Sequence, residues 1–347
     1  MINLGTPNYL TRVNHMNKKS LFAGLLTISS LIFTGSALAN STLLNVSYDV
    51  TREFYKDFNP SFVNYWKQKT GETVTINQSH GGSSKQARSV ADGLEADIIS
   101  MNQAPDIDIL YDRSKLIPKD WQKRLPNASS PTNSTTVFLV RKGNPKNIKD
   151  WDDLIKPDVS VVIPNPKTSG NGKYSYLAAW GYVIKKGGDE AQAKDFVTKL
   201  FKNVPVLDTG GRGATTTFAQ RDIGDALLTF ENEVNLIKKE LGDKFDVVYP
   251  STSILAENPI AVVDKFAIKH KNQALAQAYV DYHFSEAGQE IAAQHYLRPS
   301  LASVATKYKA RFRNIELFSV NDVFGSWSKA QKVHFADGAL FDQIYQR

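Results

Sequence analysis

The chain has 347 residues, with 42 Lys and Arg against 35 Asp and Glu and no cysteine. This length suits one large domain or two of medium size, and the 41% share of hydrophobic residues is typical of a globular protein rather than a disordered one. The lack of cysteine excludes a disulfide framework, a thiolate metal site, an iron–sulfur cluster and a Cys nucleophile.

The first 39 residues predict a secretory signal peptide, with Met1 or Met16 as the start of translation. Lys18 and Lys19 precede an apolar run over 21–33, and a small-residue cleavage pattern follows at 37–39. The run is shorter than the roughly 20 residues that span a bilayer, which argues against a membrane anchor. We therefore expect an exported chain that starts near Asn40.

The charge of the exported part is mild. Loss of residues 1–39 removes Arg12, Lys18 and Lys19 but no acidic residue, so the net charge falls from +7 to +4. No block of Lys or Arg remains, and we expect no nucleic-acid partner. We find no second long apolar run, which predicts a soluble product.

Residues 43–347 alternate strand-like and helix-like patterns. Strands are expected at 43–48, 73–77, 96–100, 136–140, 159–163, 204–207, 226–230 and 259–263. Helices are expected at 54–66 with a break at Asn59-Pro60, at 84–94, from about 173, from about 215, at 273–284 and at 287–296. This alternation predicts an α/β fold with parallel sheets covered by helices.

The order of these elements predicts two lobes. The strand at 259–263 would return the chain to its first unit, so we expect a discontinuous first lobe of 40–139 and 260–347. The second lobe, 140–259, would be inserted in it. The strands 136–140 and 259–263 would cross between the lobes as a hinge.

Four turns between a strand and a helix carry the candidate chemistry. They are Tyr48-Asp-Val-Thr51, Ser79-His-Gly-Gly-Ser-Ser84, Lys167-Thr-Ser-Gly-Asn-Gly172 and Thr209-Gly-Gly-Arg-Gly-Ala214. Glycine lets the backbone approach a ligand, and a helix N-terminus exposes N–H donors and partial positive charge. Such turns also serve simply as good caps, but several of them meeting at the carboxyl ends of strands would form an anion cage.

Other chemistries find little support in the sequence. Gly172-Lys173 is followed by Tyr174, so it does not complete a phosphate-binding P-loop. Gly81-Gly-Ser83-Ser is followed by Lys85, where a nucleophile elbow needs its second glycine. The histidines form no metal-binding pair, and we expect neither a metal nor another cofactor. Arg212 could pair with an anion directly, or it could support its loop while held by an acid such as Asp106.

Several motifs add a resemblance to the periplasmic sulfate- and thiosulfate-binding proteins of bacterial ABC importers. They are Asn45-Val-Ser-Tyr-Asp49, Gln78-Ser-His-Gly-Gly-Ser83, Val140-Arg-Lys-Gly-Asn-Pro145, Pro164-Asn-Pro-Lys-Thr-Ser-Gly170, Tyr176-Leu-Ala-Ala-Trp-Gly181, Asp208-Thr-Gly-Gly-Arg-Gly213, Ile254-Leu-Ala-Glu257, Gly288-Gln-Glu-Ile-Ala-Ala293 and Phe324-Gly-Ser-Trp327. The likeness covers nearly all of 43–347. It implies a type II periplasmic binding protein, a monomer that captures sulfate or thiosulfate and passes it to membrane permease subunits.

The resemblance also implies a set of ligand contacts. Asp49 would donate its backbone N–H, Ser83 and Ser169 their hydroxyls, and Gly170, Asn171 and Gly211 their backbone N–H groups. Arg212 and Asp106 would stand behind these contacts, so that no cationic side chain touches the anion.

Phe230 is the main departure from the sulfate-specific pattern. In Leu228-Thr-Phe-Glu-Asn-Glu233 it occupies a position where sulfate-specific members present a Trp indole N–H, which Phe cannot supply. Met101-Asn-Gln103, Thr168-Ser-Gly-Asn171 and Gly213-Ala-Thr-Thr-Thr-Phe218 look more like the thiosulfate-binding branch. We therefore expect both anions to bind, with thiosulfate at least as good a ligand as sulfate.

A structural envelope protein, which would show no anion-dependent thermal shift, stays open at this point, as do two alternatives that handle anions. One of these two is a receptor for another tetrahedral oxyanion, molybdate or phosphate. The other is a secreted ester hydrolase, for which the sequence offers neither a nucleophile paired with a base nor a metal site.

Overall fold

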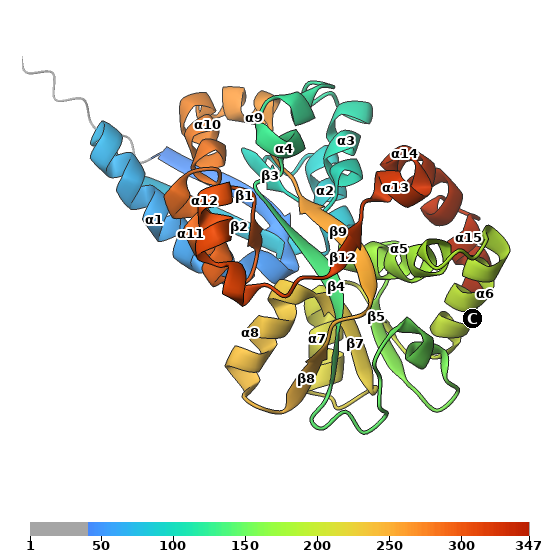
Figure 1. Cartoon of the computed structure of the whole chain (residues 1–347). Coiled ribbons are helices and arrows are strands. Elements are labelled where there is room, and N and C mark those ends of the chain that lie inside the picture. Colours follow the sequence, from blue (N-terminus) through green and yellow to red (C-terminus); the bar gives the residue numbers. More distant parts are fainter. Residues whose placement is uncertain (1–40, 347) are drawn as a thin grey trace, which may run out of the picture. The chain divides into compact units, whose positions relative to one another are not determined.

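The computed structural model describes residues 41–346, and the predicted signal peptide at 1–39 lies outside them. All described residues belong to one compact unit that contains two β-sheets (Figure 1). No helix of this part of the chain combines the length and the apolar character needed to cross a membrane.

The first sheet has four strands in the order β10-β3-β1-β2. They are β1 (Ser41–Tyr48), β2 (Val74–Gly81), β3 (Ile98–Ser100) and β10 (Ile260–Val262). β1 is parallel to β2 and β3, and β10 closes the edge antiparallel to β3. As expected, the late strand near residue 260 returns the chain to its first sheet.

Helices cover both faces of the first sheet, and we call this assembly lobe 1. They are α1 (Arg52–Thr70), α2 (Ser83–Ala91), α3 (Ala104–Asp112), α4 (Pro126–Ser129), α9 (Asp264–Lys269), α10 (Gln273–Tyr282), α11 (Glu286–Gln294) and α12 (Ala302–Lys307). One core contains Phe58 of α1 and Tyr279 of α10, and the other contains Val90 of α2 and Leu110 of α3. The predicted break in α1 is wrong, because the helix continues through Pro60.

The second sheet follows the order β12-β9-β4-β7-β5-β6, with β8 and β11 also pairing with β4. Its strands are β4 (Thr132–Arg141), β5 (Val161–Pro164), β6 (Leu207–Asp208), β7 (Ala226–Phe230), β8 (Phe245–Val248), β9 (Thr252–Asn258), β11 (Arg298–Pro299) and β12 (Glu316–Phe318). The motif Ile254-Leu-Ala-Glu257 therefore lies in a strand, β9, that the periodicity did not predict.

Lobe 2 is this second sheet with the helices that pack on it. They are α5 (Gly170–Lys185), α6 (Glu190–Lys202), α7 (Gly211–Ala219), α8 (Glu231–Leu241), α13 (Val320–Phe324), α14 (Trp327–Ala330) and α15 (Leu340–Ile344). Short 3-10 and π-helical segments complete the chain at η1 (Asp49–Thr51), η2 (Trp121–Lys123), η3 (Trp151–Ile155), η4 (Lys309–Arg311) and η5 (Gln331–Phe335).

Two details of the predicted lobes are corrected. The segment 136–140 lies inside the second sheet, where it pairs with β7 and, from Phe138 on, with β8. The chain therefore crosses earlier, where Thr132 pairs with Asn258. The last part of 260–347 does not stay with lobe 1. β12 pairs with β9, and α13 and α15 pack against α5 and α6, where Figure 1 shows them in red beside the green helices. The apolar side chains of this segment, such as Phe318 and Phe341, complete the core of lobe 2.

Candidate anion site between the lobes

The N-terminus of α5 presents unpaired backbone donors. The helix begins at Gly170, three residues before the predicted start, and Ser169 caps it by accepting from Gly172 N–H at 3.4 Å. The N–H groups of Gly170 and Asn171 donate to no acceptor among residues 41–346. These are first-turn N–H groups, which have no intrahelical acceptor and lie at the positive end of the helix dipole.

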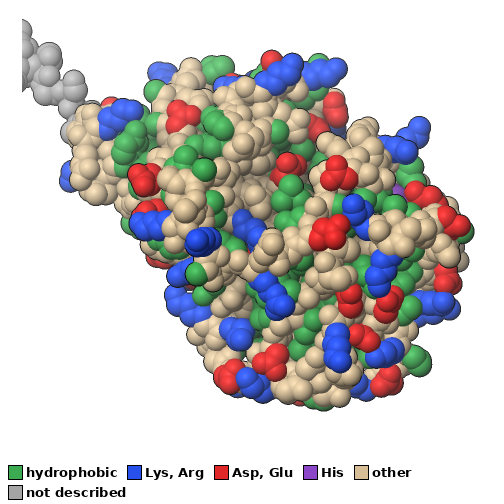
Figure 2. Space-filling view, viewed as in Figure 1, with side chains coloured by type: hydrophobic (Ala, Val, Ile, Leu, Met, Phe, Trp, Pro, Cys, Tyr) green, Lys and Arg blue, Asp and Glu red, His purple; other side chains and the backbone are tan. Residues whose placement is uncertain are grey.

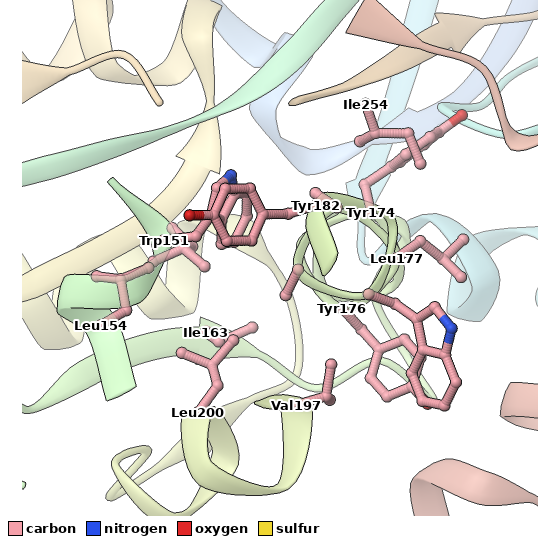
Figure 3. Packing of buried hydrophobic residues seen from close by; sticks show 14 of the residues in the cluster. Trp151, Leu154, Ile163, Tyr174, Tyr176, Leu177, Tyr182, Val197, Leu200 and Ile254 are labelled. Atoms are coloured by element: carbon pink, nitrogen blue, oxygen red, sulfur yellow. The ribbon is translucent and has the colours of Figure 1, made fainter. Parts of the chain in front are cut away.

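The body of α5 fixes the direction in which these donors point. The helix is buried nearly all round, and in Figure 3 its side chains radiate into packed surroundings, with Tyr182 beside Trp151 and Tyr174 beside Ile254. Val197 and Leu200 of α6 fill the space below it in the same core. A helix held on all sides has little freedom to turn, so its N-terminus is a preorganised group of donors.

The N-terminus of α7 is the second source of donors. Gly211, not the region near Thr215, opens the helix, and its N–H is also without an acceptor among the described residues. The next N–H, that of Arg212, donates to Oδ2 of Asp49 at 3.1 Å. Asp49 was expected to contribute its backbone N–H, and here its carboxylate caps α7 from the other lobe. Burial raises the pKa of this carboxyl, while the Arg212 backbone N–H lowers it.

The four candidate turns converge. A Cβ atom on Gly82 would lie 2.7 Å from Thr209 O and 2.8 Å from Thr168 O. A Cβ atom on Gly210 would lie 2.5 Å from Asp49 Oδ2, and one on Gly211 would lie 3.1 Å from Asn171 Nδ2. Only glycine allows backbones to approach so closely, which explains the glycine content of these turns.

Ser83 enters this region from the start of α2, where it is 1% exposed. Its hydroxyl donates to Oδ2 of Asp106 at 2.5 Å, and Gln103 Nε2 donates to the same oxygen at 2.7 Å. Asp106 therefore stands behind Ser83 rather than behind Arg212, and the suggested pairing of Arg212 with Asp106 is wrong. α3 carries Asp106 on its first turn and packs next to α2, which begins at Ser83.

The guanidinium of Arg212 instead lies among three carboxylates. Its terminal nitrogens are 3.4 Å from Glu233, 3.7 Å from Glu240 and 3.8 Å from Glu53. Glu53 belongs to lobe 1, so Arg212 contacts both lobes. Burial raises the pKa of Glu233 to about 7, although Arg212 and the Thr215 hydroxyl lower it. These contacts agree with the interpretation in which Arg212 supports its loop, and that role stays a prediction.

Phe230 closes β7 and is 1% exposed. Its ring packs edge-on against Tyr174 of α5 with 5.8 Å between ring centroids. The preceding residue, Thr229, accepts from Asn171 Nδ2 at 2.8 Å, so the Asn171 side chain is turned towards β7. This leaves the backbone N–H of Asn171 as its free donor.

Lys173 and Ser84 were not singled out by the sequence reasoning. Lys173 is 4% exposed, and its Nζ donates to Ser84 Oγ of lobe 1 at 3.1 Å. Burial lowers the pKa of its ammonium, while Asp106 raises it. A lysine in the first turn of an otherwise apolar helix (Lys173-Tyr-Ser-Tyr-Leu-Ala-Ala-Trp180) was the available signal, since so apolar a helix is buried all round.

The charged side chains on the surface form no patch that marks the candidate site. On the face in Figure 2, Lys and Arg are interspersed with Asp and Glu, with no single basic patch. Within 41–346, no group of three or more His, Cys, Asp or Glu is arranged to hold a metal ion. The site is thus a set of backbone donors and hydroxyls. Arg212 beside it is paired with carboxylates, and the buried Lys173 ammonium donates to the Ser84 hydroxyl.

The chain is similar in sequence to known binding proteins. A family model described as a bacterial extracellular solute-binding protein matches residues 50–298. The thiosulfate-binding protein of Pseudomonas aeruginosa is 60% identical over 328 residues, which cover 94% of this chain and 99% of that one. The chain belongs to the sulfate- and thiosulfate-binding protein family.

Further relatives support the fold as well as the family. The sulfate-binding protein of Salmonella typhimurium is 55% identical over 320 residues, covering 91% of this chain and 97% of its own length. The solved sulfate-binding protein SubI from Mycobacterium tuberculosis H37Rv aligns with a TM-score of 0.77 and 32% identity over 85% of this chain and all of that one. The predicted fold class, two α/β lobes of a solute-binding protein, is confirmed. These relatives are binding proteins, not enzymes.

Proposed function

We propose that the chain captures sulfate and thiosulfate in the periplasm and delivers them to an ABC importer. The observation that carries this proposal is the set of free N–H groups at Gly170, Asn171 and Gly211, which meet between two lobes. The Ser169 hydroxyl adds a donor, because its oxygen accepts from Gly172 N–H and its proton has no acceptor among the described residues. The named functions of the relatives point to the same ligands.

The chemistry of the donors explains why these anions suit the site. Sulfate and thiosulfate carry no proton at neutral pH, so their oxygens only accept hydrogen bonds. Hydrogen phosphate keeps one proton, which needs an acceptor. Oδ2 of Asp106, an acid beside Ser83, already accepts two hydrogen bonds. The unpartnered Oδ1 of Asn102 is the remaining acceptor beside the donors, and it is removed when this amide turns its Nδ2 to the anion. A buried polar hydrogen without a partner costs about 1–3 kcal/mol, which disfavours phosphate.

The number of donors sets a rough affinity. About six charge-assisted hydrogen bonds of about 1.5–3 kcal/mol each give about 9–18 kcal/mol. Lobe closure and imperfect desolvation reduce that sum. A net of about 8 kcal/mol corresponds to micromolar affinity, which is adequate for a scavenging receptor.

Closure is the step that couples capture to delivery. Contacts such as Arg212 N–H to Asp49 and Lys173 to Ser84 join the two lobes. A ligand that contacts both lobes favours this joined state over an open one, and the joined shape would dock on the permease subunits. Capture by a monomer of the exported chain is sufficient for this cycle.

Titration calorimetry on ligand-depleted protein with sulfate, thiosulfate, molybdate and phosphate tests the ligand. We expect micromolar binding of sulfate and thiosulfate, with phosphate at least tenfold weaker. Tighter binding of phosphate or molybdate than of either sulfur anion would contradict the proposal, as would turnover of an aryl sulfate.

Delivery and export need their own measurements. Expression in a bacterium that lacks its own sulfate- and thiosulfate-binding proteins should restore growth on either anion as sulfur source. The protein recovered from the periplasm should begin near Asn40. Growth that stays absent despite periplasmic protein and measured binding would contradict delivery while leaving capture intact.

A further inference from the structure

The side-chain amide of Asn102 lies unused in the middle of the candidate site. Asn102 follows β3 and is 2% exposed, and its backbone N–H donates to Ser83 Oγ at 3.5 Å. Its Oδ1 is buried without a hydrogen-bond partner. Its Nδ2 is not among the fully buried unpartnered atoms, and no hydrogen bond joins it to the described residues. Buried amides normally satisfy both groups, so an idle amide at this position indicates a missing partner.

The amide lies against the N-terminus of α5. A Cβ atom on Gly170 would collide with Asn102 Oδ1 and would lie 2.9 Å from Nδ2. Gly170 is also the residue whose free N–H opens the helix. The unpartnered amide of lobe 1 and the unpartnered donors of lobe 2 therefore face the same small volume, with Ser83 on its lobe 1 side.

The other asparagine of the site shows the contrast. Asn171 Nδ2 donates to Thr229 Oγ1 at 2.8 Å, and its Oδ1 accepts from Ser175 Oγ at 3.5 Å. Both of its polar groups are thus occupied within lobe 2, and neither is left for a ligand. Asn102 has the same chemistry with both groups free.

We propose that Asn102 is a further ligand-contacting residue, whose Nδ2 donates a hydrogen bond to the bound anion. This inference rests on the proposed function. A half-turn of the amide about its Cβ–Cγ bond exchanges Oδ1 and Nδ2 and presents the donor to an anion that only accepts. The contact supplies a side-chain N–H in a site where Phe230 supplies none.

Two substitutions test the donor by calorimetry with thiosulfate, sulfate and phosphate. Asn102→Ala should weaken binding of both sulfur anions about ten- to hundredfold, as expected for one lost charge-assisted hydrogen bond. Asn102→Asp keeps the shape but brings an acceptor and a negative charge, so it should weaken them further. Asn272→Ala is the matched control. Asn272 is a buried amide at the opposite end of β1, where it donates to Thr42 O, and its loss should leave affinities unchanged.

The outcomes separate this inference from the proposed function. If the wild-type protein binds neither sulfur anion, the proposed function itself fails. If the wild type binds and Asn102→Ala stays within twofold of it, Asn102 is no ligand contact. Improved phosphate binding by Asn102→Asp would indicate that residue 102 accepts a hydrogen bond from the ligand. That result would contradict the proposal that Nδ2 donates one. Should Asn102→Asp fail to fold, Asn102→Ala decides alone.

Discussion

The two lobes bring different kinds of group to the site. Lobe 2 offers backbone N–H groups at Gly170, Asn171 and Gly211 that have no other partner and are fixed by buried helices. Lobe 1 offers the first-turn N–H groups of Ser83 and Ser84 in α2, which also donate to no acceptor among the described residues, and in addition side chains. Two of these side chains are engaged, since Ser83 donates to Asp106 and the Asp49 carboxylate accepts from Arg212 N–H.

Because of this difference, the free energy needed to make a donor available for the ligand differs between the lobes. Donors on lobe 2 are ready before the ligand arrives, so most of their interaction energy is available for binding. A hydroxyl such as that of Ser83 must exchange one acceptor for another, which reduces its net contribution. We infer that lobe 2 supplies most of the affinity and that lobe 1 completes the enclosure.

Gly170→Ala should give the largest loss. Its Cβ would take the place of the Asn102 amide beside the free N–H groups, so the amide must turn away and the space next to these donors is filled. We therefore expect the dissociation constants for sulfate and thiosulfate to rise about a hundredfold or more. Calorimetry measures this loss. Gly213→Ala, in the first turn of α7, would place its Cβ 3.1 Å from Asp208 Cβ, a tight contact without collision, and should change affinity less than threefold.

A double variant sharpens this test. Asn102→Ala removes the atoms with which the new methyl group collides, so the losses of Asn102→Ala and Gly170→Ala should not add. Full additivity would mean that Asn102 and Gly170 do not contact each other in the ligand-bound protein. It would contradict the contact between lobe 1 and lobe 2 at this point.

Ser169→Ala and Ser83→Ala should separate affinity from stability. Ser169 has a free hydroxyl proton, so its loss should weaken binding about ten- to thirtyfold and lower the free energy of unfolding by only about 1 kcal/mol. Ser83 donates to a buried carboxylate, so Ser83→Ala should cost about 2 kcal/mol of stability and less than tenfold in affinity. Thermal unfolding and calorimetry on both variants give the comparison. The reverse ranking in affinity would show that lobe 1 donates as freely as lobe 2.

Phe230→Trp should shift preference rather than overall strength. An indole N–H added at the end of β7 offers sulfate a donor, so we expect the ratio of sulfate to thiosulfate affinity to rise about three- to tenfold. Phe218→Trp, in the separate core on the α7 side of the sheet, controls for overpacking. An unchanged ratio would mean that residue 230 does not set selectivity.

The sequence predicts the lobe 2 donors better than it predicts their surroundings. Strand and helix periodicity place all the candidate turns, but the predicted helix starts near 173 and 215 were late. Glycine has low helix propensity, yet in a first turn its N–H needs no intrahelical acceptor, so α5 and α7 begin at Gly170 and Gly211.

Features that depend on tertiary packing were out of reach. Nothing local in 316–346 says that this segment packs on lobe 2, because that depends on which exposed apolar surface it covers. The burial of Lys173 and the free amide of Asn102 likewise depend on the meeting of the two lobes. The same reason explains the wrong partner for Arg212, since several acids were equally eligible by sequence.

Glu233→Gln should have the smallest effect on affinity, and it should change stability as a trend with pH. Burial raises the pKa of Glu233 from 4.5 to about 7 in the folded chain, against Arg212 and Thr215, with Asp49 and Glu240 adding to the rise. The folded chain therefore binds this proton more tightly than the unfolded chain. Its contribution to the free energy of unfolding is complete below about pH 4.5 and is lost as the pH rises to about 7, on the order of 3 kcal/mol at most.

Gln cannot titrate, so Glu233→Gln should gain stability relative to the wild type between pH 5 and pH 8. Denaturant unfolding at each pH measures the difference between the two proteins, which removes the contributions of other titrating groups. Glu240→Gln, whose carboxylate is 47% exposed and lies at the same Arg212, is the matched control and should show a much smaller trend. Parallel profiles for Glu233→Gln and the wild type would contradict a buried, proton-binding carboxyl behind α7. The contribution of the carboxylates around Arg212 to the free energy of unfolding would then be the same at every pH tested.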